Sequence, residues 1–423
     1  MLDIKLLREN PDFVAEGVKA KGVDADIPAI LDLDKQRRES LSEVEQLKYK
    51  RNEVSREIGK AKKAGEDAEA QIAEMKTVGE EIAALDEKVR DIDTQIKNLV
   101  LELPNLPHES TPRGTSEEEN VVVRSWGEKT EPSAGKTDHK TFGEDLGLFD
   151  FARGAKISGS GFPIYTGKGA KLERALISYF LDTLEEKFGY TEVIPPHLVS
   201  RESMTGTGQL PKFEEQMYHC TEDDLFLIPT AEVPVTNIHA QEVLKEADLP
   251  VKYCAYTPCF RREAGSYGKD VRGFLRLHQF NKVEMVQFVH PEKSYEVLEE
   301  MVTYSEAILK GLKLPYRVLE LCSGDLGFGA AKCYDLEVWS PQEEKWLEVS
   351  SVSNFEDYQA RRAGIKGKIH GKNTFLHTLN GSGLATPRVL VALLDYYQQE
   401  DGSFEVPEVL KPYLKFESIQ PGE

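Results

Sequence analysis

Apolar residues spaced like one face of a long helix constrain this chain more than any other feature. The main run steps by threes and fours, with an interruption at Gly79, through Ile72, Met75, Ile82, Leu85, Val89, Ile92, Ile96, Leu99 and Leu103. A looser partner run comprises Leu41, Val44, Leu47, Val54, Ile58 and Ala61. Gly65 lies between the two runs, where one helix must end and the next begin. The pattern predicts an antiparallel coiled-coil hairpin over about residues 28–103, too long to fold back into a small core.

Charge is divided unevenly between the two predicted helices. The first carries the basic cluster Lys48, Lys50, Arg51, Arg56, Lys60, Lys62 and Lys63. The second carries the acidic residues Glu66, Asp67, Glu69, Glu74, Glu80, Glu81, Asp86 and Glu87. A net charge of −20 argues against general attraction to phosphate, but basic residues gathered towards the turn favour RNA as a partner. A coiled coil that only dimerises the chain is the alternative.

Composition indicates the cellular compartment of the protein and argues against a zinc site. The chain of 423 residues is 40% hydrophobic, has no long apolar run, and begins with a segment broken by charge. We therefore expect a cytoplasmic protein with no membrane association. The five cysteines form no Cys-x-x-Cys pair, so no zinc site is expected and the thiols should be buried and free.

The second part of the chain is predicted to be a mixed domain. Residues 103–140 are rich in Pro, Ser, Thr and Glu without periodicity, which is typical of a linker. Strands are expected over residues 251–256, 282–289, 333–339 and 345–350. Because a strand, a loop and a strand follow one another around residue 270, the expected fold is α+β, an antiparallel sheet flanked by helices.

Two short segments indicate a nucleotide site. Phe260–Glu263 contains Arg261, whose charged, planar guanidinium suits a phosphate, and Glu263, which would share its strand face and accept from an adenine amino group. Residues 380–388 contain glycines that let a backbone approach a ligand, and end in Arg388 at a helix start. Taken singly, a cross-strand ion pair and a tight turn explain these segments equally well.

A third segment connects them to a known family. A helical pattern over residues 174–181 precedes Gly189–Pro196, which reads as a short strand ending in prolines. In this order the chain resembles the class II aminoacyl-tRNA synthetases, whose motifs 1, 2 and 3 match Pro196, Phe260–Glu263 and Gly381–Arg388. Over its whole length, including residues 206–213 and 228–234, it resembles the bacterial seryl-tRNA synthetases. The resemblance implies a tRNA-binding domain over residues 1–110 and a catalytic domain over residues 111–423.

The resemblance also implies the ATP site. Arg261 and Arg388 would be catalytic, Arg261 at the α-phosphate and Arg388 at the far phosphates or the adenine. The residues matched to ATP binding are Arg261, Arg262, Glu263, Phe280, Glu348, Val349, Ser350, Ser351 and Arg388. Glu348 and Ser351 would hold Mg²⁺ together with ATP. From the residues alone, Phe280 could equally pack in the core and Glu348 could lie on a solvated strand.

Serine selection is assigned in the same way. The matched residues are Thr230, Ala231, Glu232, Glu284 and Ser382. A helix cap is the alternative for residues 230–232. The motif 2 loop, with Gly265–Gly268 and Val271–Gly273, is expected to be mobile until tRNA or ATP binds. Arg272 would touch the tRNA acceptor end, with an exposed loop charge as the alternative.

The resemblance implies a serine–tRNA ligase that forms seryl-adenylate and charges tRNA(Ser), with tRNA(Sec) as a second substrate, and that works as a homodimer. Only one helix and a short tail follow Arg388, so no C-terminal anticodon domain is expected. Two other functions stay open. One is a ligase with another acceptor, against which the intact arm argues. The other is a non-catalytic RNA-binding paralogue, which should have lost some of the motif residues.

Overall fold

The protein is described by a computed structural model covering residues 1–132, 135–264 and 273–422. It divides into two units. The hairpin unit comprises residues 2–19 and 23–104, and the larger unit comprises residues 1, 20–22 and 105–423. Among the described residues, no helix is both long enough and apolar enough to cross a membrane.

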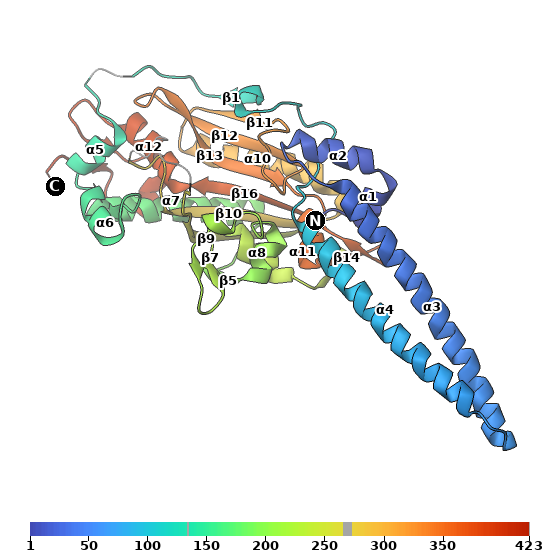
Figure 1. Ribbon diagram of the computed structural model, residues 1–423. Coiled ribbons are helices and arrows are strands. Elements are labelled where there is room, and N and C mark those ends of the chain that lie inside the picture. The colour runs from blue at the N-terminus through green and yellow to red at the C-terminus, as the bar shows by residue number, and fades with distance from the viewer. Residues whose placement is uncertain (133–134, 265–272, 423) are drawn as a thin grey trace. The chain divides into compact units, whose positions relative to one another are not determined.

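The hairpin unit is helical throughout. Its helices are α1 Ile4–Glu9, α2 Pro11–Ala20, α3 Ile27–Ala64 and α4 Glu69–Leu101. Asp26 caps the start of α3 by accepting from the Ala29 amide at 3.0 Å, and Gly65 ends it in the left-handed conformation with φ 79°. Helices α3 and α4 lie side by side (Figure 1). The predicted antiparallel hairpin is therefore confirmed.

The seam between α3 and α4 follows the predicted pattern with two corrections. Val44, Leu47, Met75, Ile82 and Leu85 pack together around Val78, as the periodicity requires, although Val78 was missed. Ile72 and Leu99 were assigned to the seam but are 42% and 39% exposed, and Val100, 3% exposed, is buried in place of Leu99. The α-helix turns every 3.6 residues, so a strict step of three and four drifts off the buried face along a long helix.

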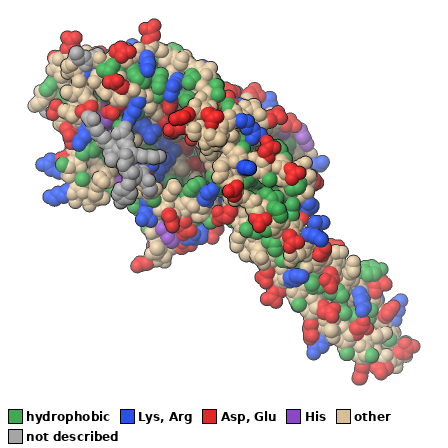
Figure 2. All heavy atoms as spheres, turned by 45° about the horizontal axis from the view of Figure 1, so that its top comes forward, with side chains coloured by type: hydrophobic (Ala, Val, Ile, Leu, Met, Phe, Trp, Pro, Cys, Tyr) green, Lys and Arg blue, Asp and Glu red, His purple; other side chains and the backbone are tan. Residues whose placement is uncertain are grey.

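Ion pairs join the basic helix to the acidic one. Lys50 Nζ lies 2.6 Å from Glu74, Lys48 Nζ lies 3.3 Å from Asp86, and Arg37 pairs with Asp93. Figure 2 shows acidic and basic side chains interspersed along the hairpin. Exposed pairs of this kind each contribute only about 0.2–1 kcal/mol, so the apolar seam carries most of the hairpin's stability.

An eight-stranded sheet forms the centre of the larger unit. In spatial order its strands are β1 Val121–Trp126, β11 Tyr316–Glu320, β12 Lys332–Ser340, β13 Lys345–Asn354, β16 His377–Ala385, β10 Gln279–Val289, β9 Val251–Phe260 and β4 Thr191–Glu192. Only the edge strand β4 runs parallel to its neighbour β9; the other pairs are antiparallel. The predicted α+β fold is confirmed, with the four expected strands present and extended by one to four residues at one end or both.

The remaining elements of the larger unit surround this sheet. Its helices are α5 His139–Asp145, α6 Phe151–Ser158, α7 Gly167–Phe188, α8 Arg201–Thr207, α9 Glu232–Thr236, α10 Ser294–Gly311, α11 Tyr358–Ala363 and α12 Thr386–Tyr397. Its small sheets pair β2 Phe149–Asp150 with β3 Ile164–Tyr165; β5 Leu198–Ser200 and β6 His219–Cys220 with β7 Leu225–Leu227; β8 Val243–Lys245 and β15 Lys372–Phe375 with β14 Lys366–Ile369; and β17 Phe404–Glu405 with β18 Ser418–Ile419.

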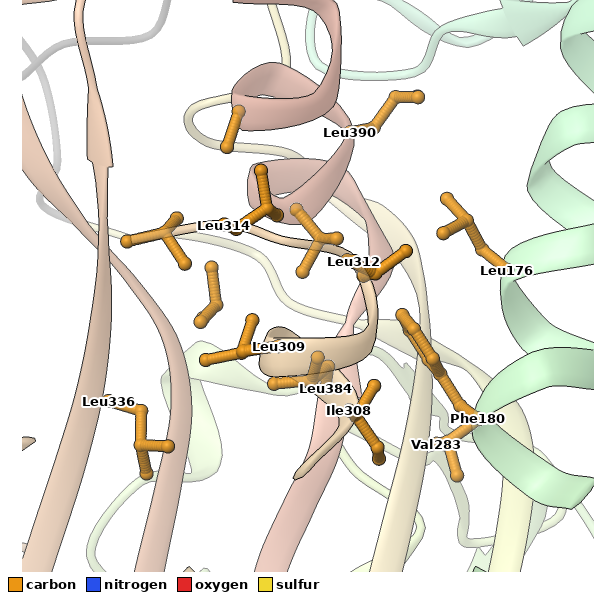
Figure 3. Packing of buried hydrophobic residues seen from close by; sticks show 14 of the residues in the cluster. Leu176, Phe180, Val283, Ile308, Leu309, Leu312, Leu314, Leu336, Leu384 and Leu390 are labelled. Carbon is orange, nitrogen blue, oxygen red and sulfur yellow. The ribbon is translucent and has the colours of Figure 1, made fainter. Parts of the chain in front are cut away.

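The main core lies between the sheet and three long helices. Leu176 and Phe180 of α7, Ile308 of α10 and Leu390 of α12 are all fully buried and belong to one apolar cluster with Val283 of β10. Figure 3 shows these side chains pointing towards one another. Burial of each such side chain contributes roughly 1.5–3 kcal/mol, which fixes the sheet against these helices.

Strand alternation leaves the other sheet face available for a site. On β10, Val283 and Met285 belong to the main core, so Lys282 and Glu284 point to the opposite face. Glu284 lies directly across the ladder from Ser382 of β16.

Of the five free cysteines, Cys220 is exposed and the other four are buried, so the expectation of buried thiols is wrong for Cys220.

Candidate active site

A single cavity of about 700 Å³ collects most of the predicted site residues. The predicted residues on its wall are Thr230, Glu232, Arg261, Glu263, Phe280, Glu284, Glu348, Val349, Ser350, Ser351, Ser382 and Arg388. They come from the end of β9, from β10, β13 and β16, and from the starts of α9 and α12. Figure 2 shows basic side chains inside a hollow of the larger unit.

Arg261 and Arg388, far apart in sequence, line this same cavity. Arg261 Nε donates to the Pro229 carbonyl at 3.3 Å, and its guanidinium carbon is 5.1 Å from the centre of the Phe280 ring. Arg388 Nη1 donates to the Glu348 carbonyl at 2.9 Å. Protein contacts thus hold both guanidiniums against the cavity wall.

Glu263 and Arg262 differ from their predicted settings. Strand β9 ends at Phe260, and Glu263 has a left-handed φ of 51°, so Arg261 and Glu263 share a cavity but not a strand face. Glu263 Oε2 accepts from Arg276 Nε at 2.6 Å. Arg276 also lines the cavity and was missed; its only sequence signal was its place beside motif 2. Arg262 is exposed and does not line the cavity.

A β-bulge brings Glu348 and Ser351 to the same cavity. Residues three apart on a regular strand point to opposite faces. Here Ser350 faces Leu336 and Glu348 faces Glu337 across the ladder, which leaves Val349 as an extra residue. The bulge changes the alternation, so both side chains reach the site. Ser350 is 1% exposed, and its hydroxyl donates to the Ser382 carbonyl at 2.6 Å.

A buried lysine joins two of the predicted serine-binding residues. Lys282, about 9% exposed at its side chain, donates from Nζ to Thr230 Oγ1 at 2.8 Å and pairs with Glu284. Thr230 Oγ1 donates in turn to Glu284 Oε2 at 2.9 Å. Sequence reasoning missed Lys282, although an unpaired buried carboxylate at Glu284 would have required a cation nearby.

Glu232 lies in the cavity beside a second carboxylate, that of Glu284. Burial, and then the neighbouring charge of Glu284, raise its pKa to about 7. Gln359 Nε2 donates to Glu232 Oε1 at 2.6 Å. The Glu232 amide donates to Thr230 Oγ1 at 3.3 Å, but the N-cap of α9 is Ala231 and no side chain caps this helix. Gln359 gave no sequence signal.

One further expectation is corrected. Ala231 is fully buried in a second apolar cluster and does not line the cavity, because it precedes α9 with its side chain against Val235 and Ala255. At Gly381 an added Cβ would lie 2.9 Å from Val352 and at Gly383 2.8 Å from Leu184, so side-chain packing excludes larger residues there. Gly265–Gly268 of the predicted mobile loop and the predicted contact of Arg272 lie outside the described residues.

The fold and the cavity agree with comparisons to known proteins. Residues 213–397 match the family model of the tRNA synthetase class II core domain (G, H, P, S and T), and residues 1–107 match that of the seryl-tRNA synthetase N-terminal domain. The sheet and its motifs thus define a class II aminoacyl-tRNA synthetase core.

Comparisons with individual proteins identify the family within this class. A serine–tRNA ligase of Chlorobaculum parvum is 54% identical over 429 residues, covering 99% of this chain and all of the relative. The solved seryl-tRNA synthetase of Pyrococcus horikoshii, complexed with ATP, is 39% identical with a TM-score of 0.92, and each chain is covered fully. The enzyme of Naegleria fowleri, complexed with AMP, is 31% identical with a TM-score of 0.88, covering 100% of this chain and 99% of that one. This chain belongs to the seryl-tRNA synthetase family.

Proposed function

We propose that the cavity catalyses the serine–tRNA ligase reaction. L-Serine and ATP form seryl-adenylate and pyrophosphate, and the seryl group then passes to the terminal ribose hydroxyl of tRNA(Ser) with release of AMP. The observation that carries this proposal is the placement of Arg261 and Arg388 in one cavity with Thr230, Glu284 and Ser382. The ATP and AMP complexes of the two solved relatives support an adenine nucleotide in this site.

Serine activation requires that the serine carboxylate be positioned at the α-phosphorus and that the phosphate charge be neutralised. A carboxylate is already nucleophilic at neutral pH, so the first step needs no general base. Attack on the α-phosphorus places negative charge on the phosphate oxygens, and Arg261 would neutralise it at the cavity wall. Arg388 would hold the far phosphates or cover the adenine. Phe280, whose ring lies next to the Arg261 guanidinium, would stack on the base.

Glu348 and Ser351 suit a magnesium ion that arrives with ATP. A carboxylate and a hydroxyl are hard oxygen ligands of the kind Mg²⁺ accepts beside phosphate. The Glu348 side chain is 48% exposed, and the bulge directs it and Ser351 to one cavity. When bound there, Mg²⁺ would withdraw charge from the phosphates. Val349 and Ser350 would shape the wall through their backbone.

The serine end combines acidic and hydroxyl groups. Glu232 and Glu284 can hold the ammonium and accept from the serine hydroxyl, while Thr230 and Ser382 orient the ligand. Lys282 neutralises one carboxylate of the pair, so Glu232, Glu284 and Lys282 together carry a single negative charge when Glu232 is ionised. That charge matches the substrate ammonium. A site with committed hydroxyl partners rejects alanine by roughly 10⁴-fold in favourable cases.

We assign tRNA recognition to residues 1–110 and catalysis to residues 111–423. The long hairpin with its basic cluster would bind the tRNA by recognising its shape rather than its anticodon. Family membership extends the substrates to tRNA(Sec). The N-terminal family match over residues 1–107 supports this division. We place the activity in the cytoplasm.

We propose further that the enzyme works as a homodimer through motif 1. Beside the edge strand β4, Ile194 is 85% exposed and Leu198 is 43% exposed. Such apolar exposure next to a sheet edge suits a subunit contact. Sedimentation equilibrium that finds only monomer at micromolar concentration would contradict this proposal.

Pyrophosphate exchange across the amino acids tests the main proposal. Exchange with serine, and little with alanine, glycine or threonine, is the expected result. Exchange led by another amino acid would overturn the substrate, and no exchange at all would favour the non-catalytic RNA-binding paralogue. Transfer of serine to a carrier protein in preference to tRNA(Ser) would favour a ligase with another acceptor.

A further inference from the structure

The buried side chain of Gln359 connects three segments of the larger unit. Gln359 belongs to α11 and is 1% exposed. Its Oε1 accepts from Thr378 Oγ1 of β16 at 2.7 Å. Its Nε2 donates to Glu232 Oε1 at the start of α9 at 2.6 Å and to the Thr207 carbonyl at 3.2 Å. Glu232 and Thr207 line the cavity, whereas Gln359 lies behind them.

These partners leave the Gln359 amide one orientation. A carboxylate and a main-chain carbonyl only accept hydrogen bonds, so the amide nitrogen must face Glu232 and Thr207. The amide oxygen then faces Thr378, which has a hydroxyl to donate. Reversing the amide would place an oxygen against two acceptors, so the three contacts support one another.

Glu232 needs such a donor because burial and the neighbouring Glu284 oppose its charge and raise its pKa. Gln359 favours the ionised form most, followed by the charge of Lys282 and a hydrogen bond from Asn380. Lys282 and Glu284 of β10 are the charged groups that act on Glu232, whereas Gln359 of α11 and Asn380 of β16 act on it as neutral groups. A hydrogen bond to a carboxylate fixes its rotamer as well as its charge.

On the basis of the proposed function, we propose that Gln359 is a positioning residue for serine binding. Its amide donates to Oε1 of Glu232 and so holds this carboxylate in the orientation that receives the amino acid. Gln359 touches neither ATP nor serine in this arrangement. Its effect should therefore appear in the interaction with serine and not in that with ATP.

The test compares Gln359→Leu with the wild-type enzyme in pyrophosphate exchange. Loss of a hydrogen bond to a charged group should raise the KM for serine by roughly 10- to 100-fold, with the KM for ATP changed less than about 2-fold. Gln399→Leu is the matched control, since Gln399 is exposed and its Nε2 donates only to the Tyr397 carbonyl at 3.1 Å. Its kinetics should equal those of the wild type.

Two further variants separate positioning from folding. Thr378→Val leaves Gln359 in place but removes the donor that orients its amide, and should give a smaller rise in the serine KM that Thr378→Ser restores. In a Glu232→Gln background, Gln359→Leu should add almost nothing, because both changes act on one contact.

The outcomes are distinct. Absence of exchange in the wild-type enzyme would overturn the proposed function itself. With normal wild-type exchange, a serine KM within about 2-fold of wild type in Gln359→Leu would overturn the positioning role, and so would an equal rise in the ATP and serine KM values. If Gln359→Leu does not fold, an unchanged serine KM in Thr378→Val would overturn the role just as directly.

Discussion

Arg388 Nη1 donates a hydrogen bond to the main-chain carbonyl oxygen of Glu348, 2.9 Å away. The same nitrogen lies 3.4 Å from Glu348 Oε2, and Arg388 Nε lies 3.4 Å from the Leu275 carbonyl. The first contact ties the start of α12 to β13, whose backbone is fixed in the sheet. The contact with the Glu348 carboxylate is longer, so in the proposed reaction a phosphate of ATP would replace it without loss of the anchor.

Replacing Arg388 by lysine should separate its contact with the Glu348 carbonyl from its proposed contact with a phosphate of ATP. A lysine has no planar fork, so it cannot contact both the Glu348 carbonyl and a phosphate in the same way. We expect the KM for ATP to rise by roughly 10-fold or more in pyrophosphate exchange, with the serine KM nearly unchanged. Arg153→Lys is the control, because Arg153 is 81% exposed and pairs only with Asp150. An unchanged ATP KM in Arg388→Lys would remove Arg388 from the nucleotide site.

Arg261→Ala should abolish pyrophosphate exchange and leave tRNA binding nearly intact. Charge on the α-phosphate would lose its partner, while the hairpin unit is untouched. Filter binding of tRNA(Ser) alongside the exchange assay measures both effects. Exchange above one tenth of the wild-type rate would contradict a catalytic role for Arg261.

The serine KM should depend on pH through Glu232. Its pKa is raised to about 7, so the carboxylate that holds the ligand is mostly protonated at pH 6 and mostly ionised at pH 8. The KM for serine should therefore fall by roughly 10-fold between these values. Folding stability has the opposite pH dependence. The raised pKa of Glu232 contributes stability that is fully present below its ordinary pKa of 4.5 and is lost as the pH rises through about 7.

Glu232→Gln supplies the control for this pH dependence. The amide does not titrate, so the serine KM should be high and nearly flat between pH 6 and pH 8. A slope equal to that of the wild type would assign the titration to another group.

Lys282→Met should destabilise the fold and weaken serine binding together. The substitution leaves Glu284 buried without its cation, which costs about 3–5 kcal/mol when one member of a buried pair is removed. Urea unfolding measures the loss. Lys293→Met is the comparison: Lys293 pairs with Glu296 at 3.0 Å with both side chains over 60% exposed, and its removal should change the free energy of unfolding far less. Equal losses in the two variants would contradict the burial argument.

Deleting residues 36–98 should spare pyrophosphate exchange and damage tRNA charging. The deletion removes most of α3 and α4, whose seam forms its own cluster around Val44, Val78 and Ile82. Aminoacylation of tRNA(Ser) by the shortened chain should fall at least 10-fold in kcat/KM, since shape recognition of the RNA is lost. Unimpaired charging would show that the coiled coil has no role in tRNA binding.

Local patterns predicted the parts of this protein that depend on near neighbours in the chain. The hairpin could be read from helical spacing, and Gly65 marked its turn, because helix contacts recur every three or four residues. The same locality explains the errors: Ile72 and Leu99 fit the spacing but lie off the buried face, since drift along a long helix depends on its partner helix.

The site depended on contacts between distant segments. The motif residues Arg261 and Arg388 were visible in the sequence, but only strand pairing brought β9 and the start of α12 to one cavity. Lys282 and Gln359 carried no signal, because each acquires its role from a carboxylate that another strand or helix presents.

The amino-acid sequence by itself determined the hairpin, the α+β class and the two motif arginines that line the cavity, since these follow from periodicity and from residue chemistry. Tertiary structure alone decided which side chains face the cavity. The bulge at Val349 turns Glu348 and Ser351 to the same side, whereas Ala231, between two cavity residues, points into the core. Side-chain direction depends on how strands register with their neighbours, and that register is set by the packing of the whole sheet.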